Sequence, residues 1–189
     1  MRIYEYKDYN EYVEAQTKTN RNKLSWVYWK PASLEGVSNH KKTADNILCH
    51  GTRNGAELKF FKKRFPNAYV VGTEISDTAT QFHMTVQHDF TLPKEEWLGK
   101  FDIVYSNSFD HSIDPEKTID TWKNQLSPTG TLYLEYSEEQ SEGSYADPLD
   151  ATAKEIEELI STQLDVVGKI TKGIKRSGVI FICERKQDD

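Results

Sequence analysis

Hydrophobic positions along the chain occur in short runs, and stretches rich in polar residues, glycine or proline separate them. Short runs dominated by apolar and β-branched residues are typical of strands that are buried in a parallel sheet. Five such runs follow one another, over residues 47–49, 69–73, 85–88, 101–106 and 131–136. Because a helical or polar segment separates consecutive runs, their order predicts an open α/β sheet.

The intervening segments carry apolar residues at helical spacing. One helix is predicted from residue 56 to about residue 64, and Pro66 marks its end. A second helix is expected to begin after Asp114, an acidic capping residue that is followed by proline. Residues 151–162 predict a third helix from their stripe of isoleucine and leucine. These helices supply the crossovers that parallel strands require.

Two further apolar runs, over residues 164–170 and 179–184, follow the last helix and predict a terminal β-hairpin. A nicotinamide-binding Rossmann domain would continue with parallel crossovers instead. The sequence shows no internal repeat. The hairpin therefore separates this chain from the dinucleotide-binding domains.

The segment 1–45 differs in character from the remainder, 46–189, which contains the sheet pattern. Its tyrosine-rich start suits a strand followed by a helix, and its polar character suggests a lid. The aromatic stretch 24–31 has two interpretations, a core plug over the sheet edge, which the composition favours, or an aromatic wall of a substrate pocket. Residues 32–45 are interpreted as a polar connector.

A glycine turn follows the first strand of the sheet pattern. Gly51 and Gly55 lack a Cβ atom, so the backbone there can turn sharply and a ligand can lie against it. Glu74 ends the next strand, 23 residues after Gly51 (74 − 51), where a carboxylate can bind the hydroxyls of a ribose. Arg53 occupies a place where a dinucleotide pyrophosphate needs bare backbone. The turn alone also fits an ordinary strand-to-helix connection, and Glu74 favours a nucleoside site.

The loop 107–112 follows the fourth strand, and such loops hold the chemistry of open parallel sheets. His111 has a side chain suited to accept a proton near neutral pH, and Asp110 could orient it. Asn107 could donate a hydrogen bond to a substrate. Two alternatives remain open at this point, a structural role for His111 and a loop-capping role for Asn107.

The order of these features resembles the class I S-adenosylmethionine-dependent methyltransferases between residues 46 and 186. Gly51 and Gly55 match two of the three glycines in the family's first motif, Glu74 matches its ribose-binding acid, and Asp89 matches the acid near the adenine. The resemblance implies a single-domain, Rossmann-like α/β fold whose seven-stranded, mostly parallel sheet ends in an antiparallel hairpin. It implies binding of S-adenosylmethionine by Gly51, Thr52, Arg53, Gly55, Glu74, Ile75, Asp89, Phe90 and Ser106, and catalytic roles for Asn107, Asp110 and His111.

Two residues depart from the family pattern. Cys49 stands where the family usually has an acid that helps hold the methionine end of the ligand, and Arg53 replaces the middle glycine. The Arg53 guanidinium could pair with the ligand carboxylate, or the side chain could point outward into solvent. The chain also resembles a poorly characterised methyltransferase subgroup in its C-H-G-T-R-x-G, G-T-E-I-S and Y-S-N-S-x-D-H segments. That resemblance implies that Cys49 and Arg53 are features of a variant within the methyltransferase family.

Composition narrows the classes of function. The chain has 189 residues, which suits one domain, and its net charge of −6 argues against a surface built for nucleic acid. Cys49 and Cys183 lie in apolar runs without metal-ligand spacing, so we expect reduced core thiols and no metal site. No apolar run approaches the roughly 20 residues of a membrane span, and the tyrosine-rich, acidic start is unlike a signal peptide. We therefore expect a cytoplasmic protein whose oligomeric state the sequence leaves open.

Three hypotheses for function follow. The first is methyl transfer from S-adenosylmethionine to a small-molecule or sugar-like acceptor. The second is a non-catalytic domain that binds S-adenosylmethionine or serves as an adaptor, which the departures at Cys49 and Arg53 motivate. The third, a nicotinamide oxidoreductase, lacks a turn that is compatible with pyrophosphate. Turnover of the donor discriminates the first hypothesis from the second.

Overall fold

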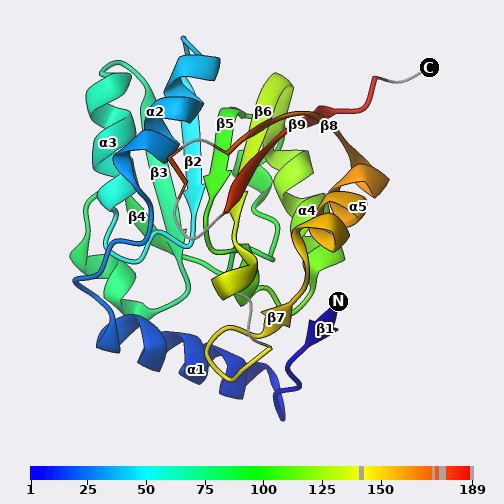
Figure 1. The fold of residues 1–189 in the computed structure, drawn as a ribbon. Coiled ribbons are helices and arrows are strands. Elements are labelled where there is room, and N and C mark those ends of the chain that lie inside the picture. Colours follow the sequence, from blue (N-terminus) through cyan, green and yellow to red (C-terminus); the bar gives the residue numbers. More distant parts are fainter. Residues whose placement is uncertain (141–142, 172, 175–177, 188–189) are drawn as a thin grey trace.

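The structure is a computed structural model, and it describes residues 1–140, 143–171, 173–174 and 178–187. Seven strands form its main sheet (Figure 1). In spatial order they are β4 (Thr85–Gln87), β3 (Tyr69–Glu74), β2 (Asn46–His50), β5 (Phe101–Ser106), β6 (Leu126–Tyr136), β9 (Val179–Arg185) and β8 (Leu164–Ile170). The first five are parallel, and β9 pairs antiparallel with both of its neighbours. The predicted α/β fold with a terminal hairpin is confirmed, and the turn of that hairpin lies partly outside the described residues.

Helices cover both faces of this sheet (Figure 1). Helices α2 (Pro31–His40) and α3 (Ala56–Arg64) lie on one face, and α4 (Pro115–Gln125) and α5 (Ala153–Gln163) lie on the other. Side chains alternate along each strand, so Leu48 packs with the core under α4 and α5. Its neighbour Ile47 packs with the core under α2 and α3. The central strands are thus buried on both faces, as their continuous apolar runs predict.

Helix α1 (Tyr9–Asn22) lies across the carboxyl ends of the parallel strands (Figure 1). Its side chains bond to segments that follow β3, β4, β5 and β6. Four short 3₁₀ helices also occur in the connections, η1 (Asp77–Gln81), η2 (Glu95–Trp97), η3 (Phe109–His111) and η4 (Glu138–Gln140). Because these connections are short, α1 can lie directly over the carboxyl ends of the parallel strands.

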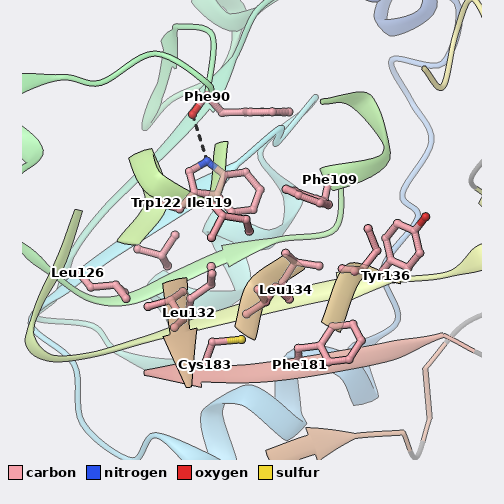
Figure 2. Close-up of a cluster of buried hydrophobic side chains, with 14 of the residues drawn as sticks. Phe90, Phe109, Ile119, Trp122, Leu126, Leu132, Leu134, Tyr136, Phe181 and Cys183 are labelled. Atoms are coloured by element: carbon pink, nitrogen blue, oxygen red, sulfur yellow. Dashed lines mark hydrogen bonds between the residues drawn. The ribbon is translucent and has the colours of Figure 1, made fainter. Parts of the chain in front are cut away.

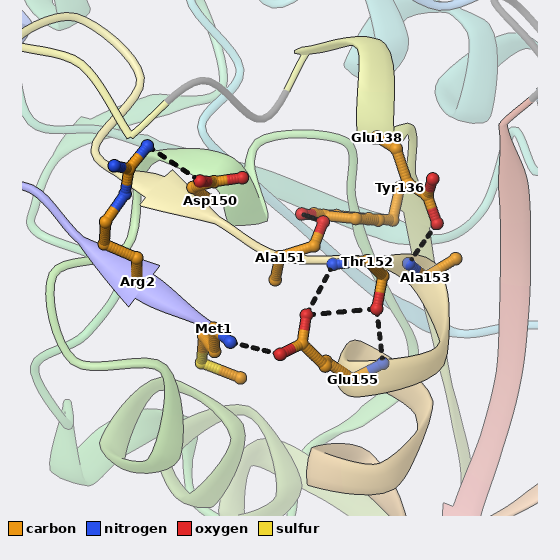
Figure 3. A network of polar contacts seen from close by, with 9 residues as sticks. All are labelled: Met1, Arg2, Tyr136, Glu138, Asp150, Ala151, Thr152, Ala153 and Glu155. Carbon is orange, nitrogen blue, oxygen red and sulfur yellow. Dashed lines mark hydrogen bonds and ion pairs between the residues drawn. The ribbon is translucent and has the colours of Figure 1, made fainter.

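The amino-terminal residues are attached to the start of α5. Strand β1 (Arg2–Ile3) pairs antiparallel with β7 (Leu149–Asp150), and the Arg2 guanidinium contacts Asp150 at 2.9 Å (Figure 3). The amino group of Met1 forms an ion pair with Glu155, which also takes part in the capping box of α5 (Figure 3). These contacts anchor the chain before α1. Among the described residues, no helix has both the length and the apolar character of a membrane span.

One segment differs from the sequence-based prediction. Residues 32–45 were expected to be a polar connector, but most of them belong to α2, whose Leu34 and Val37 are fully buried. Pro31 begins this helix with a preset backbone angle, and its two core-facing residues are three positions apart. A stripe of only two apolar residues is a weak signal in sequence. The expected buried thiols are confirmed, because Cys49 and Cys183 are both free and buried.

A buried histidine ties the sheet to α4. His50, the last residue of β2, shares hydrogen bonds with Thr73 Oγ1 at 3.0 Å and Gln125 Oε1 at 2.8 Å. Its ring stacks on Trp122 with 4.9 Å between centroids, and the Trp122 indole donates to the carbonyl of Phe90 (Figure 2). Burial lowers the pKa of His50 to about 3, so the folded protein holds a neutral imidazole.

This burial predicts a pH-dependent contribution to stability. Between pH 6.5 and 3 the unfolded chain binds a proton at His50 that the folded chain does not. The free energy of unfolding therefore decreases by about 1.4 kcal/mol for each pH unit by which the pH is lowered in that range. Replacement of His50 by Gln removes this pH-dependent contribution to the free energy of unfolding. We expect the destabilisation caused by His50→Gln to be about 2 kcal/mol smaller at pH 5 than at pH 7.5.

Urea unfolding of both proteins at the two pH values measures this difference. The exposed His83 supplies the matched control, because His83→Gln removes an imidazole that lies at the surface. An equal cost of His50→Gln at both pH values would show that the buried imidazole is not held neutral.

Candidate functional site

A crevice opens at the carboxyl ends of β2 and β5, which are neighbouring parallel strands. It has two lobes, of about 210 Å³ and 40 Å³, and Gly51, Arg53, Ser108 and His111 contribute to both. Ligands of open α/β sheets bind at such an edge, where strand-end loops diverge. The predicted glycine turn and the predicted loop 107–112 therefore form one site.

The turn after β2 has the backbone conformation that its glycines suggest. Gly51, Arg53 and Gly55 have φ angles of +69°, +47° and +65°. A Cβ atom on Gly51 would lie 2.5 Å from Cβ of Ser108, whose hydroxyl donates to the Gly51 carbonyl at 3.1 Å. The two strand-end loops thus touch at a point where only glycine fits.

Glu74 lies at the end of β3 and faces the turn. Its side chain is 7% exposed, and its two oxygens accept hydrogen bonds from the backbone amides of Arg53 and Ser76, each at 3.0 Å. Burial raises the pKa of Glu74, and the amide bonds together with positive charge at His111 and Arg53 oppose that rise. The carboxylate lines the smaller lobe, as the sequence-based prediction requires.

Three further predicted residues line the smaller lobe, namely Ile75, Asp89 and Phe90. Asp89 accepts hydrogen bonds from the Tyr9 hydroxyl and from the amide of Thr91, both at 2.8 Å. Helix α1 covers this lobe with Tyr12, Gln16, Thr19 and Asn20. These α1 residues are not among the predicted site residues, because nothing in their order along the chain reveals which loops the helix crosses.

Aromatic side chains line the larger lobe. Trp26, Val27, Tyr28 and Trp29 all contribute to its wall, and Trp26 is 55% exposed. The favoured interpretation of residues 24–31 as a core plug is therefore wrong for Trp26, and only Trp29 also packs toward the core, against Phe60. Their side chains are not buried as a core plug because these residues form neither a helix nor a strand and instead follow the wall of the crevice.

Arg53 projects into the crevice. Its guanidinium carbon lies 4.8 Å from the centre of the Tyr28 ring, within range of a cation–π interaction. Its Nε atom is buried and lacks a hydrogen-bond partner among the described residues. The alternative in which Arg53 points outward into solvent is therefore wrong, because the side chain lines the crevice and its Nε donor is buried.

Glu57 is a site residue that the sequence analysis missed. It lies in the first turn of α3, is 3% exposed and lines the larger lobe. Burial raises the pKa of Glu57 to about 8, although its own backbone amide and the charge of Arg53 lower it. The buried indole Nε1 of Trp29 lies beside it without a hydrogen bond of normal geometry. The sequence gives no sign of this role, because an acidic residue in the first turn of a helix is ordinarily explained by its favourable interaction with the helix dipole.

The predicted catalytic residues also meet at the larger lobe, which Asn107, Asp110 and His111 line. Two carboxylates lie near the imidazole, because ligand atoms of Asp110, His111 and Asp147 all lie within 4.8 Å of one another. The shorter described contact is that of Asp147, with an oxygen 3.6 Å from His111 Nδ1, which also lies 3.1 Å from the Ala146 carbonyl. Burial raises the pKa of Asp110 to about 6, against the opposing charge of His111. Asp147 was missed because it comes from the segment before β7, far along the chain.

The remaining predicted residues differ in position. Thr52 lines the larger lobe, whereas Gly55 and Ser106 lie outside the lining of both lobes. Ser106 Oγ donates to the His50 carbonyl and accepts from the amide of Ser108, so it braces the loop after β5. Gly55 is the N-cap of α3. These two residues shape the turn and the loop that carry the lining residues.

The structure is similar to many solved methyltransferase structures. A geranyl diphosphate C-methyltransferase from Streptomyces coelicolor matches with a TM-score of 0.74 and 11% identity, over 93% of this chain and 98% of that one. The 1,6-didemethyltoxoflavin-N1-methyltransferase of Burkholderia thailandensis matches with a TM-score of 0.69 and 14% identity, over 94% and 87% of the two chains. The N-methyltransferase NodS of Bradyrhizobium japonicum matches with a TM-score of 0.69 and 13% identity, over 92% and 100%.

No protein-family model matches the chain, and no curated protein matches it in sequence. At these identities the likeness is one of fold. The predicted resemblance to the class I S-adenosylmethionine-dependent methyltransferases is thus confirmed in the fold, a seven-stranded, mostly parallel sheet with a terminal antiparallel hairpin.

The contact between Gly51 and Ser108 generates a testable prediction. Gly51→Ala should destabilise the protein by about 2–4 kcal/mol, because it adds a side chain at positive φ and a clash with Ser108. Ser108→Gly removes the clashing atom, so the double variant should be about 1–3 kcal/mol more stable than the sum of the single effects.

Chemical denaturation of the four proteins in this cycle measures the coupling. The part of the Gly51→Ala cost that Ser108→Gly does not recover is the cost of the positive φ. Additive effects would mean that the two loops are not in contact.

Proposed function

We propose that this protein is an S-adenosylmethionine-dependent methyltransferase that acts on a small molecule. The observation that carries the proposal is the buried carboxylate of Glu74, which adjoins the glycine turn in the crevice of a methyltransferase fold. Three proteins with the same fold were crystallised with S-adenosylhomocysteine. The orphaned Arg53 Nε and the absence of a Cβ on Gly51 are features that suit a ligand in this crevice.

The smaller lobe would hold the adenosine part of the ligand. Glu74 would accept hydrogen bonds from the ribose hydroxyls, and Asp89 would accept one from the adenine amino group, with Ile75 and Phe90 as apolar neighbours. A lobe of 40 Å³ is too small for a nucleoside while Tyr9 occupies Asp89 and Tyr12 fills the space above. We therefore propose that α1 acts as a lid that moves to admit the ligand, in line with the predicted role of residues 1–45.

The larger lobe would hold the methionine end. Arg53 and the indole of Trp29 offer buried donors for the carboxylate, and Glu57 offers an acceptor for the ammonium group. Burial raises the pKa of Cys49, and the charge of Glu57 raises it further. In this proposal Glu57 on α3 supplies the carboxylate that the family usually carries at the position of Cys49.

The acceptor would enter along the aromatic wall and meet Asn107, Asp110 and His111. When bound, S-adenosylmethionine supplies an electrophilic methyl group, and transfer requires in-line alignment of the acceptor atom. Asn107 would orient the acceptor by a hydrogen bond, while Asp110 and His111 would assist removal of its proton. Trp26 and Tyr28 would bind a planar or sugar-like acceptor by its flat face.

A screen of small-molecule acceptors with donor carrying a labelled methyl group tests the reaction. Transfer of the label to an acceptor, abolished when donor binding is abolished, supports an enzyme. Tight binding of donor with no transfer to any acceptor in a broad screen would favour the non-catalytic binding domain instead.

Removal of the Glu74 carboxylate should weaken binding of the ligand. We expect Glu74→Ala to reduce affinity for S-adenosylhomocysteine by about 1.5–3 kcal/mol, the range for a hydrogen bond to a charged group. Isothermal titration calorimetry measures the change, and circular dichroism checks that the fold persists. Glu95→Ala, at an exposed position, is the control. Equal affinities of wild type and Glu74→Ala would refute the assignment of the ribose site.

Removal of the Arg53 guanidinium should affect only ligands that carry the carboxylate. Arg53→Ala should lower affinity for S-adenosylhomocysteine by about 1.5–3 kcal/mol and leave affinity for methylthioadenosine nearly unchanged, because methylthioadenosine lacks the amino-acid end. Arg64→Ala, at an exposed position of α3, serves as the matched control. Similar losses for both ligands would place Arg53 elsewhere in the site.

A further inference from the structure

Three potential metal ligands converge on the wall of the larger lobe. Asp110 and His111 lie on η3 after β5, and Asp147 lies in the segment before β7. One ligand atom from each residue can be chosen so that all three lie within 4.8 Å of one another. Three ligand atoms spread around a single cation at bond lengths of about 2.0–2.3 Å lie roughly 3.5–4.0 Å from one another, so binding would draw the farther pairs closer by up to about 1 Å.

Asp110 points to a cation most directly. It is 7% exposed and lines the cavity, and no described side chain forms a hydrogen bond or an ion pair with its carboxylate. Removal of a carboxylate from water is unfavourable unless a cation or donors replace the water. The Asp110 carboxylate is therefore buried, lies close to Asp147 and His111, and has no side-chain hydrogen bond or ion pair among the described residues.

The surroundings hold the three groups in place. His111 Nδ1 donates to the Ala146 carbonyl at 3.1 Å, which leaves the lone pair on Nε2. The same carbonyl accepts from Gln16 Nε2 at 3.1 Å. Asp147 is fixed through Ser144, whose amide donates to the Asp147 carbonyl and whose hydroxyl accepts from the Asp147 amide. A backbone carbonyl that orients a histidine, with ligands on fixed segments, is the usual support of a metal site.

We propose that Asp110, His111 and Asp147 bind a divalent cation in the larger lobe. Two carboxylates balance the charge of the ion, and the mixed oxygen and nitrogen set suits Mn²⁺ and similar ions. The remaining coordination positions face the cavity, so they would be filled by water or by oxygen atoms of a bound molecule. If the proposed methyl transfer is correct, this ion holds an acceptor hydroxyl and favours its deprotonated form, and His111 acts as a ligand of the ion.

Titration of the full-length, tag-free protein with Mn²⁺ at pH 7.5 tests the site. Electron paramagnetic resonance reports free Mn²⁺, and calorimetry gives the affinity. We expect one saturable site in the wild type. Asp147→Asn and His111→Gln should each weaken Mn²⁺ binding at least tenfold, and Asp110→Asn should do the same. Asp165→Asn and His83→Gln change exposed residues of the same types and should bind Mn²⁺ as the wild type does.

The outcomes separate the cation site from the proposed function, because Mn²⁺ binding is measured without donor or acceptor. Absence of saturable Mn²⁺ binding in the wild type would overturn the site and identify His111 and Asp147 as a plain ion pair. Equal affinities in wild type and Asp147→Asn would overturn it as well. Binding of S-adenosylhomocysteine, measured separately in metal-free buffer, decides the cofactor site whatever the Mn²⁺ result.

Discussion

The close approach of two strand-end loops is the constraint on which the rest of the site depends. Strands β2 and β5 are neighbours at the centre of the sheet, so the turn after one and the loop after the other leave at the same point. Gly51 lies against Ser108 there, and a side chain at residue 51 would push the loops apart. Both lobes of the crevice border this contact. A change in the loop separation would therefore alter the smaller and the larger lobe together.

The crevice concentrates buried carboxyl groups to an extent that stability alone does not explain. Glu57, Glu74 and Asp110 are all nearly inaccessible to solvent, and burial raises the pKa of each. Arg53 is a basic side chain that lines both lobes, and its own backbone adopts a left-handed conformation. Buried groups with raised pKa values and residues with strained backbone cluster at functional sites. The electrostatics of the crevice therefore support the proposed binding site.

Helix α1 connects the two halves of the proposed mechanism. The Tyr9 hydroxyl donates to Asp89 in the smaller lobe, while the Tyr12 hydroxyl donates to the His111 carbonyl and Gln16 donates to the Ala146 carbonyl beside the proposed cation ligands. The proposed movement of α1 would release these contacts with the loops that carry His111 and Asp147. In this proposal, entry of the ligand and arrangement of the larger lobe are coupled through one helix.

The sequence by itself determined the parallel strands, the glycine turn and the position of Glu74, because each depends on local patterns: apolar runs, residues that permit positive φ and a short distance along the chain. It also indicated the terminal hairpin and hence the fold. Tertiary structure alone decided that Asp147 lies beside His111, that Glu57 is buried beside Arg53 and that Trp26 lines a cavity. It likewise turned residues 32–45 largely into helix α2, whose two core residues are a faint signal. The physical reason is the same in each case. These outcomes depend on which segments, distant in the sequence, come into contact in space, and a local pattern of polarity does not specify those contacts.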